Sequence, residues 1–175
     1  LLGVSITGWM NNPDILFDEN ILEKGAKIVK EVNREVAQII GINAAARTTC
    51  VKPSGNASVL LQTASGIHAE HSNMYIRNVQ MNKESEITQA IMKTNPYMVE
   101  DSVWSAGGTD VVVSFPILPK KGSMYKDDLL GVKHLELVKK AQKHWVEAGT
   151  NEDLCADKGV RHNVSNTIIA VSYTH

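Results

Sequence analysis

Hydrophobic residues recur at helical spacing in two long stretches of the chain. One stretch covers residues 20–40, where charged residues fill the positions between the apolar ones. The other covers residues 128–148 and has the same separation of an apolar and a polar face. The residues predicted to face the core are Leu22, Ala26, Val29, Val36 and Ile40 in the first helix, and Leu130, His134, Leu137, Val138, Ala141 and Trp145 in the second.

Capping residues indicate where these helices begin and end. Asp18 or Asn20 is predicted to cap the first helix, because a short side-chain oxygen accepts a hydrogen bond from an unpaired N–H of the first turn. Asp127 or Asp128 is predicted to cap the second helix in the same way. Gly41 is expected to end the first helix, because glycine readily adopts the left-handed conformation that closes a helix.

Short runs of small and β-branched residues predict strands near residues 3–8, 45–51, 110–115 and 164–171. Strands that alternate with helices in this order indicate the α/β class, so these four strands should be mainly parallel neighbours. The two long helices should then pack on one side of them.

The middle of the chain has a weaker pattern. Residues 75–81 alternate like a strand, and residues 85–93 suggest a short helix that Asn95 and Pro96 close. Pro116 and Pro119 are expected to end the strand at 110–115. We nevertheless interpret the connection between Ala64 and Asp110 as irregular overall, and long irregular connections are often functional.

Composition narrows the function classes. The chain is 43% hydrophobic and 21% charged, with a net charge of −1, which gives no basic surface for nucleic acid. Its apolar runs are too short to span a bilayer, and no signal peptide is visible. Cys50 and Cys155 are expected to be free thiols in a reducing, cytoplasmic location. Because the chain opens in an apolar run without Met, we expect it to be cut from a longer protein.

A turn rich in small polar residues, at 53–58, follows the predicted strand at 45–51. A helix is expected to follow this turn, and N–H groups at a helix start favour a bound anion. Ser54, Asn56 and Ser58 would add side-chain donors, and Gly55 would let a phosphate approach the backbone. The same residues also suit an ordinary helix cap after a proline, so residue chemistry alone leaves both alternatives open.

Other polar clusters are weaker candidates. His68, Glu70 and His71 could suggest a metal site, but no further ligand cluster has suitable spacing, and we interpret them as the polar rim of a loop. Neither Cys50 nor Cys155 has a neighbouring motif that would lower a thiol pKa, so neither is predicted to be a nucleophile.

Four segments, in order across nearly the whole chain, resemble segments of ribonucleotide reductase large chains. The segments and the family patterns are residues 2–8 (R-x-G-x-G-x-T-G), residues 51–58 (K-P-S-G-T-x-S), residues 65–68 with 75–79 (S-S-G-I-H-P and Y-Y-I-R-R-V), and residues 142–146 with 162–168 (Q-x-x-W and N-V-S-x-T). The G-I-H version at 66–68 is most similar to the monomeric adenosylcobalamin-dependent triphosphate reductases.

The resemblance implies a partial ten-stranded α/β barrel, to which residues 1–175 would contribute the later strands and helices as a fragment of the catalytic barrel domain. It implies reduction of ribonucleoside triphosphates to deoxyribonucleotides for DNA synthesis. Adenosylcobalamin would generate a thiyl radical, and a dithiol such as thioredoxin would supply electrons. The implied phosphate-binding residues are Pro53, Ser54, Gly55, Asn56, Ala57 and Ser58, and a possible active-site loop comprises Ser65, Gly66, Ile67 and His68.

The chain also departs from the family pattern. Asn56 stands where the family has Thr, which could alter the phosphate donors. The N-P-C-G-E loop of the family's radical cysteine does not occur, so we assign no catalytic residue and no metal ligand, and expect the chain alone to be inactive. Two alternatives stay open: a reductase class that uses a metal-radical partner subunit, or a non-catalytic nucleotide-binding module.

Overall fold

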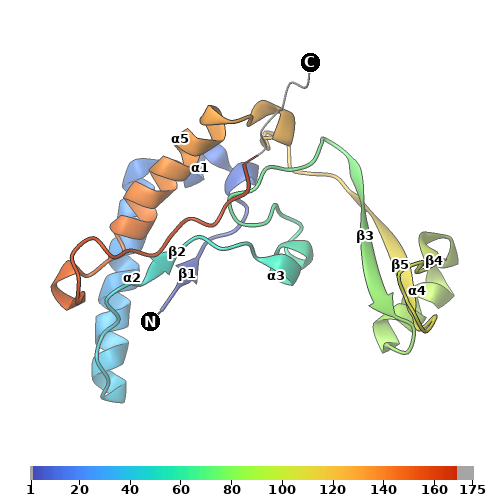
Figure 1. Cartoon of the computed structure of the whole chain (residues 1–175), viewed down its shortest axis with the longest axis horizontal. Coiled ribbons are helices and arrows are strands. Elements are labelled where there is room, and N and C mark those ends of the chain that lie inside the picture. The colour runs from blue at the N-terminus through green and yellow to red at the C-terminus, as the bar shows by residue number, and fades with distance from the viewer. Residues whose placement is uncertain (1, 169–175) are drawn as a thin grey trace. The chain divides into compact units, whose positions relative to one another are not determined.

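The computed structural model describes residues 2–168 and divides the chain into two compact units (Figure 1). The first unit combines residues 1–72 and 119–175, and the second contains residues 73–118. The first unit's elements are β1 (Val4–Ser5), η1 (Trp9–Asn11), α1 (Pro13–Leu16), α2 (Glu19–Ile40), β2 (Thr49–Cys50), α3 (Gly55–Leu60), η3 (Lys126–Asp128), α5 (Val132–Ala141), η4 (Gln142–Glu147) and η5 (Glu152–Leu154). The second unit's elements are β3 (Tyr75–Asn82), α4 (Glu86–Thr94), η2 (Pro96–Met98), β4 (Val99–Asp101) and β5 (Asp110–Ile117).

The first unit is built on short parallel strands. β1 pairs with β2 in parallel, and Val51, directly after β2, forms a parallel bridge with Val164. Three of the four strand regions predicted to be parallel neighbours therefore are. The strands are much shorter than predicted, and the part of the last one beyond residue 168 lies outside the described residues.

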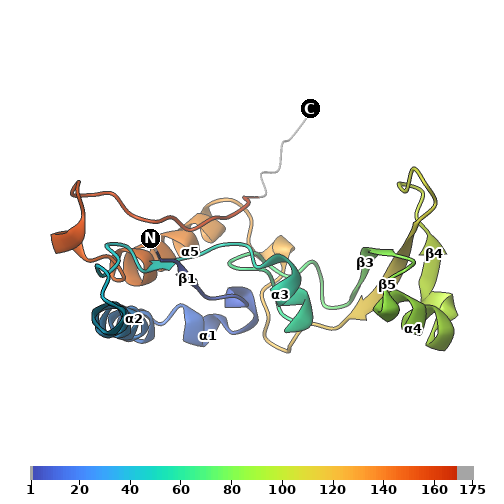
Figure 2. The ribbon, with the colours of Figure 1, turned by 90° about the horizontal axis from the view of Figure 1, so that it is seen from below.

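The first long helix begins and ends as predicted. The Asp18 carboxylate accepts a hydrogen bond from the Ile21 N–H at 2.9 Å, and Gly41 closes α2. Leu22 and Ala26 are buried, but the predicted core residues Val36 and Ile40 are 45% and 59% exposed. Figure 2 shows α2 nearly end-on, with α1 beside it. The predicted apolar side of α2 is therefore buried near its start and exposed near its end.

The second long helix begins later than predicted. Residues 126–128 form the separate turn η3, in which the Asp128 carboxylate accepts from the Tyr125 N–H at 3.3 Å. Asp127 and Asp128 therefore do not cap α5, which begins after Gly131. The helical course then continues through the π-helical turn η4 to Glu147, close to the predicted end. Leu130 is 43% exposed, whereas His134, Ala141 and Trp145 are buried as predicted.

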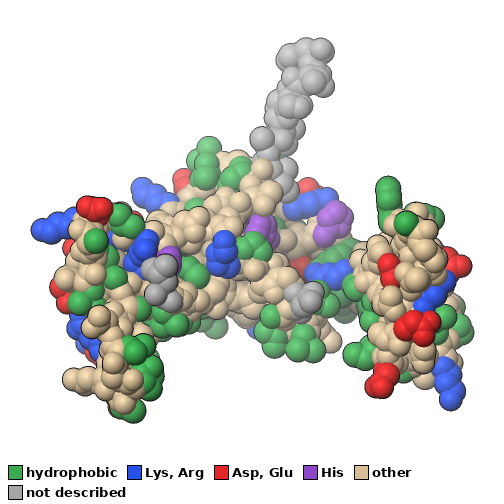
Figure 3. Space-filling model, turned by 60° about the horizontal axis from the view of Figure 1, so that its bottom comes forward, with side chains coloured by type: hydrophobic (Ala, Val, Ile, Leu, Met, Phe, Trp, Pro, Cys, Tyr) green, Lys and Arg blue, Asp and Glu red, His purple; other side chains and the backbone are tan. Residues whose placement is uncertain are grey.

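The core of the first unit joins α1, α2, α5 and the loops at the strand ends. Trp9 packs against Phe17 with ring centroids 5.2 Å apart, and its indole N–H donates to the Ile6 carbonyl at 3.0 Å. The Trp145 indole N–H donates to the Cys50 carbonyl, also at 3.0 Å. Figure 3 shows that apolar side chains also remain on the surface among charged ones. No helix among residues 2–168 is both long and apolar enough to cross a membrane.

The second unit corrects two predictions. β5 does not join the parallel strands: it lies between β3 and β4 and is antiparallel to both. The connection between Ala64 and Asp110 is not irregular, because it contains β3, α4 and β4. The alternation at 75–81 and the short helix near 85–93 are confirmed. Eight consecutive residue pairs join β3 to β5, so the backbone hydrogen bonds of β5 are satisfied locally.

Pro116 does not end β5, which continues to Ile117. β4 pairs only with residues 111–113, so β5 has a single neighbouring strand at Pro116. A proline is tolerated at such a sheet edge, because its missing N–H need not join a ladder.

Candidate functional site

Three of the segments that resemble the family patterns meet at the Thr7 side chain. Its hydroxyl oxygen lies 2.6 Å from the Ser54 hydroxyl, 3.0 Å from the Ala64 carbonyl oxygen and 2.9 Å from the Gly66 nitrogen. Ser54 belongs to the predicted phosphate loop, and Gly66 to the predicted active-site loop. The two loops are therefore neighbours in space, joined by a residue that precedes both by more than forty positions.

The loop at 53–58 follows the parallel strands, and its residues from Gly55 onward form the start of the short helix α3. Ser54 has φ −97° and ψ 3°, and Gly55 has φ +45°. A right-handed residue followed by a left-handed one turns successive N–H groups toward one concave side, a geometry that binds anions. Among the described backbone groups, none accepts a hydrogen bond from the Gly55 N–H. Lys52, exposed and directly before Pro53, adds a positive charge.

Several polar groups of this loop form hydrogen bonds within the chain. The Ser54 N–H donates to the Ser65 hydroxyl at 2.9 Å. The Ser58 hydroxyl donates to the Gly55 carbonyl at 2.8 Å, and Ser58 is only 2% exposed. Pro53 and Ala57 are exposed at the edges of the loop, and the Asn56 side chain lies outside the described parts. Ser58 thus supports the turn from inside, which residue chemistry had not indicated.

The loop at 65–68 is held tightly against the phosphate loop. Gly66 has φ +56°, and a Cβ atom at this position would lie 2.8 Å from the Lys52 carbonyl oxygen. Its own carbonyl accepts from the Trp9 N–H at 3.2 Å. Only glycine combines this backbone conformation with so close an approach. Ile67 points into the core and is fully buried.

His68 is fixed at both ring nitrogens. Nδ1 lies 2.8 Å from the Ser65 carbonyl oxygen, and Nε2 lies 3.1 Å from the Thr167 hydroxyl. A carbonyl only accepts, so Nδ1 carries a proton and donates to Ser65, while the Thr167 hydroxyl can either donate to or accept from Nε2. This contact brings the fourth family-like segment, residues 162–168, to the same place.

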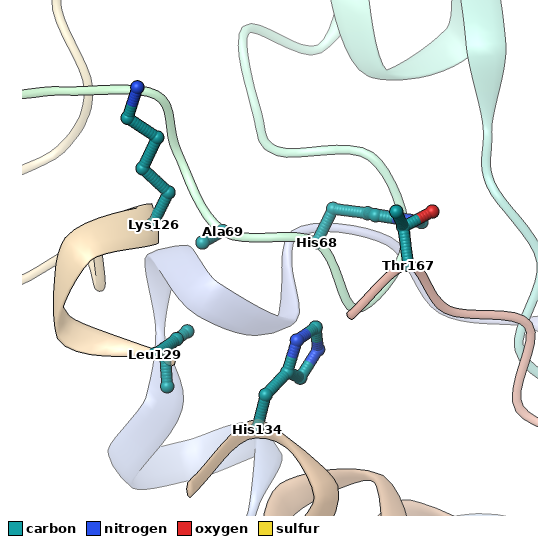
Figure 4. A pocket seen from close by; sticks show the side chains of 6 residues that line it. All are labelled: His68, Ala69, Lys126, Leu129, His134 and Thr167. Atoms are coloured by element: carbon teal, nitrogen blue, oxygen red, sulfur yellow. The ribbon is translucent and has the colours of Figure 1, made fainter. Parts of the chain in front are cut away.

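A cavity of about 110 Å³ lies beside His68 (Figure 4). His68 and Thr167 point toward one another, while His134 from α5 faces the cavity from below. The His134 Nε2 lies 3.2 Å from the Ile67 carbonyl oxygen. Burial lowers the pKa of His134, and His68 adds to this, while the bond to Ile67 opposes it. A neutral imidazole that donates Nε2–H to the Ile67 carbonyl agrees with the lowered pKa and with the 3.2 Å contact. The remaining cavity residues are Ala69, Lys126 and Leu129.

Asn11 is a structural centre that sequence reasoning missed. This buried amide donates to Glu70 at 2.8 Å and to Ser123 at 2.9 Å. Its oxygen accepts from the Thr63 hydroxyl and the Ala64 N–H, both at 2.6 Å. Glu70 is 3% exposed, so it belongs to this buried network rather than to an open loop rim. No group of three or more His, Cys, Asp or Glu side chains within residues 2–168 could hold a metal ion.

The two cysteines lie in different surroundings. Cys50 is buried at the end of β2, where burial raises the pKa of its thiol and Lys52 opposes the shift. Cys155 is half-buried, and its thiol lies 3.4 Å from the Asn151 carbonyl oxygen. A raised pKa keeps Cys50 protonated near neutral pH and makes it a poor nucleophile.

A fold comparison defines the class of protein that this arrangement resembles. The chain matches a crystal structure of a B-12-dependent (class II) ribonucleotide reductase with a TM-score of 0.60. The match has 18% sequence identity and covers 73% of this chain and 18% of that one. The predicted fold of the ribonucleotide reductase type is confirmed by this likeness.

Two curated relatives indicate which branch of this class the chain is similar to. A probable adenosylcobalamin-dependent ribonucleoside-triphosphate reductase of Dictyostelium discoideum is 29% identical over 123 residues, which are 70% of this chain and 16% of the relative. An adenosylcobalamin-dependent ribonucleoside-triphosphate reductase of Euglena gracilis is 24% identical over 149 residues, which are 83% of this chain and 20% of the relative. No family model matches. The resemblance found in the sequence is confirmed, and the chain spans about a fifth or less of these relatives.

Proposed function

We propose that this chain is a segment of an adenosylcobalamin-dependent ribonucleoside-triphosphate reductase, an oxidoreductase that makes deoxyribonucleotides for DNA synthesis. We call the longer protein that would contain it the parent protein. The observation that carries the proposal is the meeting of three family-like segments at Thr7, in the chain order of the family. The two relatives, both named for adenosylcobalamin, support this branch over one with a metal-radical partner.

Within the parent protein, the loop at 53–58 binds the triphosphate of the substrate. Its Ser54–Gly55 turn presents the Gly55 N–H, while the Ser54 N–H stays bonded to Ser65, and Lys52 adds a positive charge next to it. Charge-assisted hydrogen bonds to phosphate are stronger than those between neutral groups. The neighbouring loop at 65–68 lines the same site and orients the rest of the nucleotide. This segment thus holds the substrate in position for a reaction that other residues carry out.

In this proposal residues 1–175 form part of the catalytic barrel domain and supply its later strands and helices. The parallel arrangement of β1, β2 and Val164 supports that role, because a barrel of this kind is built from parallel strands and outer helices. The thiyl-radical chemistry belongs to other parts of the parent protein, because neither Cys50 nor Cys155 matches a catalytic cysteine of the family. The reductant would be a dithiol such as thioredoxin.

Two cavities of the described residues are too small for adenosylcobalamin. The cavity beside His68 holds about 110 Å³, and a cavity lined by Glu19, Lys140 and His144 holds about 330 Å³. A drug-sized ligand alone needs about 300–1,000 Å³, and a corrin with its nucleoside is larger. We therefore assign no residue of this chain to the cofactor and derive no step through it.

The proposal is tested in the parent protein with a ribonucleoside triphosphate, adenosylcobalamin and a dithiol. Deoxynucleotide should form only when adenosylcobalamin is present, and the chain of residues 1–175 alone should form none. Activity that needs a metal-loaded partner chain instead of adenosylcobalamin would favour another reductase class. Nucleotide binding without turnover under either condition would favour a binding module.

The phosphate loop is tested with a matched pair of glycines. Gly55 and Gly108 both have positive φ (+45° and +64°), and a Cβ atom at either meets nothing within 4 Å. Valine should therefore strain both positions similarly, but only at Gly55 should it block approach to the phosphate-facing backbone. We expect Gly55→Val to weaken substrate binding by about one to two orders of magnitude, and Gly108→Val to leave it unchanged. Equal affinities for the two variants would reduce the loop to a helix cap.

A further inference from the structure

We propose that Thr7 is a positioning residue that joins the two loops and directs the hydroxyl proton of Ser54 away from the ligand. The inference rests on the proposed function and deepens it. Thr7 lies outside both loops, in the segment at 2–8, and it reaches three groups at 2.6–3.0 Å. It is half-buried, as is Ser54, so this junction lies at the edge of the candidate site.

The direction of each hydrogen bond follows from what each partner can do. A threonine hydroxyl has one proton to donate and two lone pairs that accept. The Ala64 carbonyl can only accept, and it lies 3.0 Å from the Thr7 hydroxyl, so we assign the Thr7 proton to it. The Gly66 N–H can only donate, so it takes one lone pair of Thr7. With this assignment the Ser54 hydroxyl, 2.6 Å away, donates to the second lone pair.

This arrangement changes the expected role of Ser54. When the Ser54 O–H group donates its hydrogen bond to Thr7, the Ser54 oxygen presents only lone pairs to a ligand. A phosphate oxygen and the Ser54 oxygen then repel each other, because no proton lies between them. A fully ionised phosphate is then held by backbone N–H groups such as that of Gly55 and by Lys52, and not by the Ser54 hydroxyl. Thr7 should consequently matter more for phosphate affinity than Ser54 does.

The same contacts make Thr7 a mechanical link between the loops. Without its hydroxyl the Gly66 N–H loses its acceptor, whereas the Ala64 carbonyl keeps the Gly8 N–H as a donor at 3.0 Å. Gly66 packs with almost no clearance against the Lys52 carbonyl, directly before the phosphate loop. A shift at 65–68 would therefore be passed to 52–55, because closely packed backbone has no free space to absorb it.

The first test measures substrate affinity in the parent protein with a series of variants. Thr7→Val removes only the hydroxyl at nearly constant shape and should weaken ribonucleoside-triphosphate binding about tenfold, through lost hydrogen bonds. Thr7→Ser keeps the hydroxyl and should restore affinity to within about twofold. Ser54→Ala should cost about threefold or less, and adding it to Thr7→Val should cost nothing further. A Ser54→Ala effect equal to or larger than that of Thr7→Val would overturn the proposal.

A matched control separates positioning from stability. Thr48 is a buried threonine whose hydroxyl donates to the Gly149 carbonyl at 2.8 Å, on the strand side of the unit. Thr48→Val should lower the thermal midpoint and leave substrate affinity unchanged. If Thr7→Val behaves in the same way, Thr7 has only a structural role and the proposal fails.

A second measurement does not depend on nucleotide. In the parent protein without ligand, the Gly66 amide should exchange with deuterium at least about tenfold faster in Thr7→Val than in wild type, because it has lost its acceptor. Thr7→Ser should restore slow exchange. Faster exchange in a parent protein that binds no ribonucleoside triphosphate would refute the proposed function and leave the loop junction intact. Unchanged exchange at Gly66 would refute the junction itself.

Discussion

The two units of this chain hold their strands together by different means. In the second unit, β3 and β5 share eight consecutive residue pairs, and β4 adds three more. In the first unit, β1 and β2 share two pairs, and three isolated bridges join Arg47 to Thr150, Val51 to Val164 and Glu70 to Tyr125. Polar side chains supply much of the remaining connection there: Thr7, Asn11 and Thr48 each bond to backbone groups far away in the sequence.

The difference shows where each unit should be sensitive to mutation. A backbone ladder spreads its free energy over many similar bonds, so a single side chain on its outer face matters little. A network around single hydroxyls and amides concentrates its contribution at a few atoms, and a buried partner left without a hydrogen bond is costly. The candidate site lies in the first unit. Its loops are held by side-chain hydrogen bonds, which can fix irregular backbone that does not pair as strands.

The largest expected effect compares two glycines. Alanine at Gly66 must adopt φ +56° and bring its Cβ to 2.8 Å from a backbone oxygen, whereas alanine at Gly108 (φ +64°) meets no atom within 4 Å. We expect Gly66→Ala to lower the free energy of unfolding of the first unit by about 2–4 kcal/mol. Gly108→Ala should cost the second unit about 1 kcal/mol. Hydrogen exchange in each unit measures both values, and equal losses would contradict the comparison.

The next comparison concerns two asparagines. Asn11→Ala removes an amide that bonds four buried or half-buried partners, so we expect a loss of about 2–3 kcal/mol in the first unit. Asn78 is exposed on β3 and accepts one bond from Ser114 at 2.9 Å. Asn78→Ala should change the stability of the second unit by no more than about 0.5 kcal/mol. Urea unfolding of the two variants provides the test, and a costly Asn78→Ala would show that the ladder also depends on single side chains.

The smallest effect is a pH dependence confined to the first unit. Burial lowers the pKa of His134 below its ordinary value of 6.5. The unfolded chain therefore binds more protons than the folded one between the lowered pKa and 6.5. The contribution of the neutral imidazole is fully present above pH 6.5 and is lost as the pH falls below it. His134→Gln, which keeps a donor but cannot titrate, should flatten this dependence, as measured by urea midpoints from pH 5 to 7.5. The second unit contains no histidine and should show no such change.

Local patterns predicted the elements that local interactions form. The period of α2 and the Asp18 cap are both contained within a few consecutive residues, and the alternation of β3 reflects one strand with one half-buried and one exposed face. The start of α5 could not be predicted in this way, because Asp128 caps the preceding turn at Tyr125 instead. The partner of β5 could not be predicted either: a run of valines favours a strand but contains nothing about the direction of its neighbour.

The candidate site was likewise predicted from the sequence only in part. The loop at 53–58 and the loop at 65–68 were both identified from residue types and from their resemblance to a family. Their contact through Thr7, the inward turn of Ser58 and the approach of His134 to Ile67 were not, because each joins residues with no fixed spacing.

The sequence by itself therefore determined the course of α2, the strand at β3 and the family that the segments resemble, because periodicity, capping and motif order depend on neighbouring residues. Only the tertiary structure decided that β5 belongs to an antiparallel sheet, that Val36 and Ile40 of α2 stay exposed, and that the hydroxyls of Thr7 and Ser54 lie 2.6 Å apart. These outcomes depend on which distant groups come within about 3 Å of one another, and hydrogen bonding and packing act only at that range.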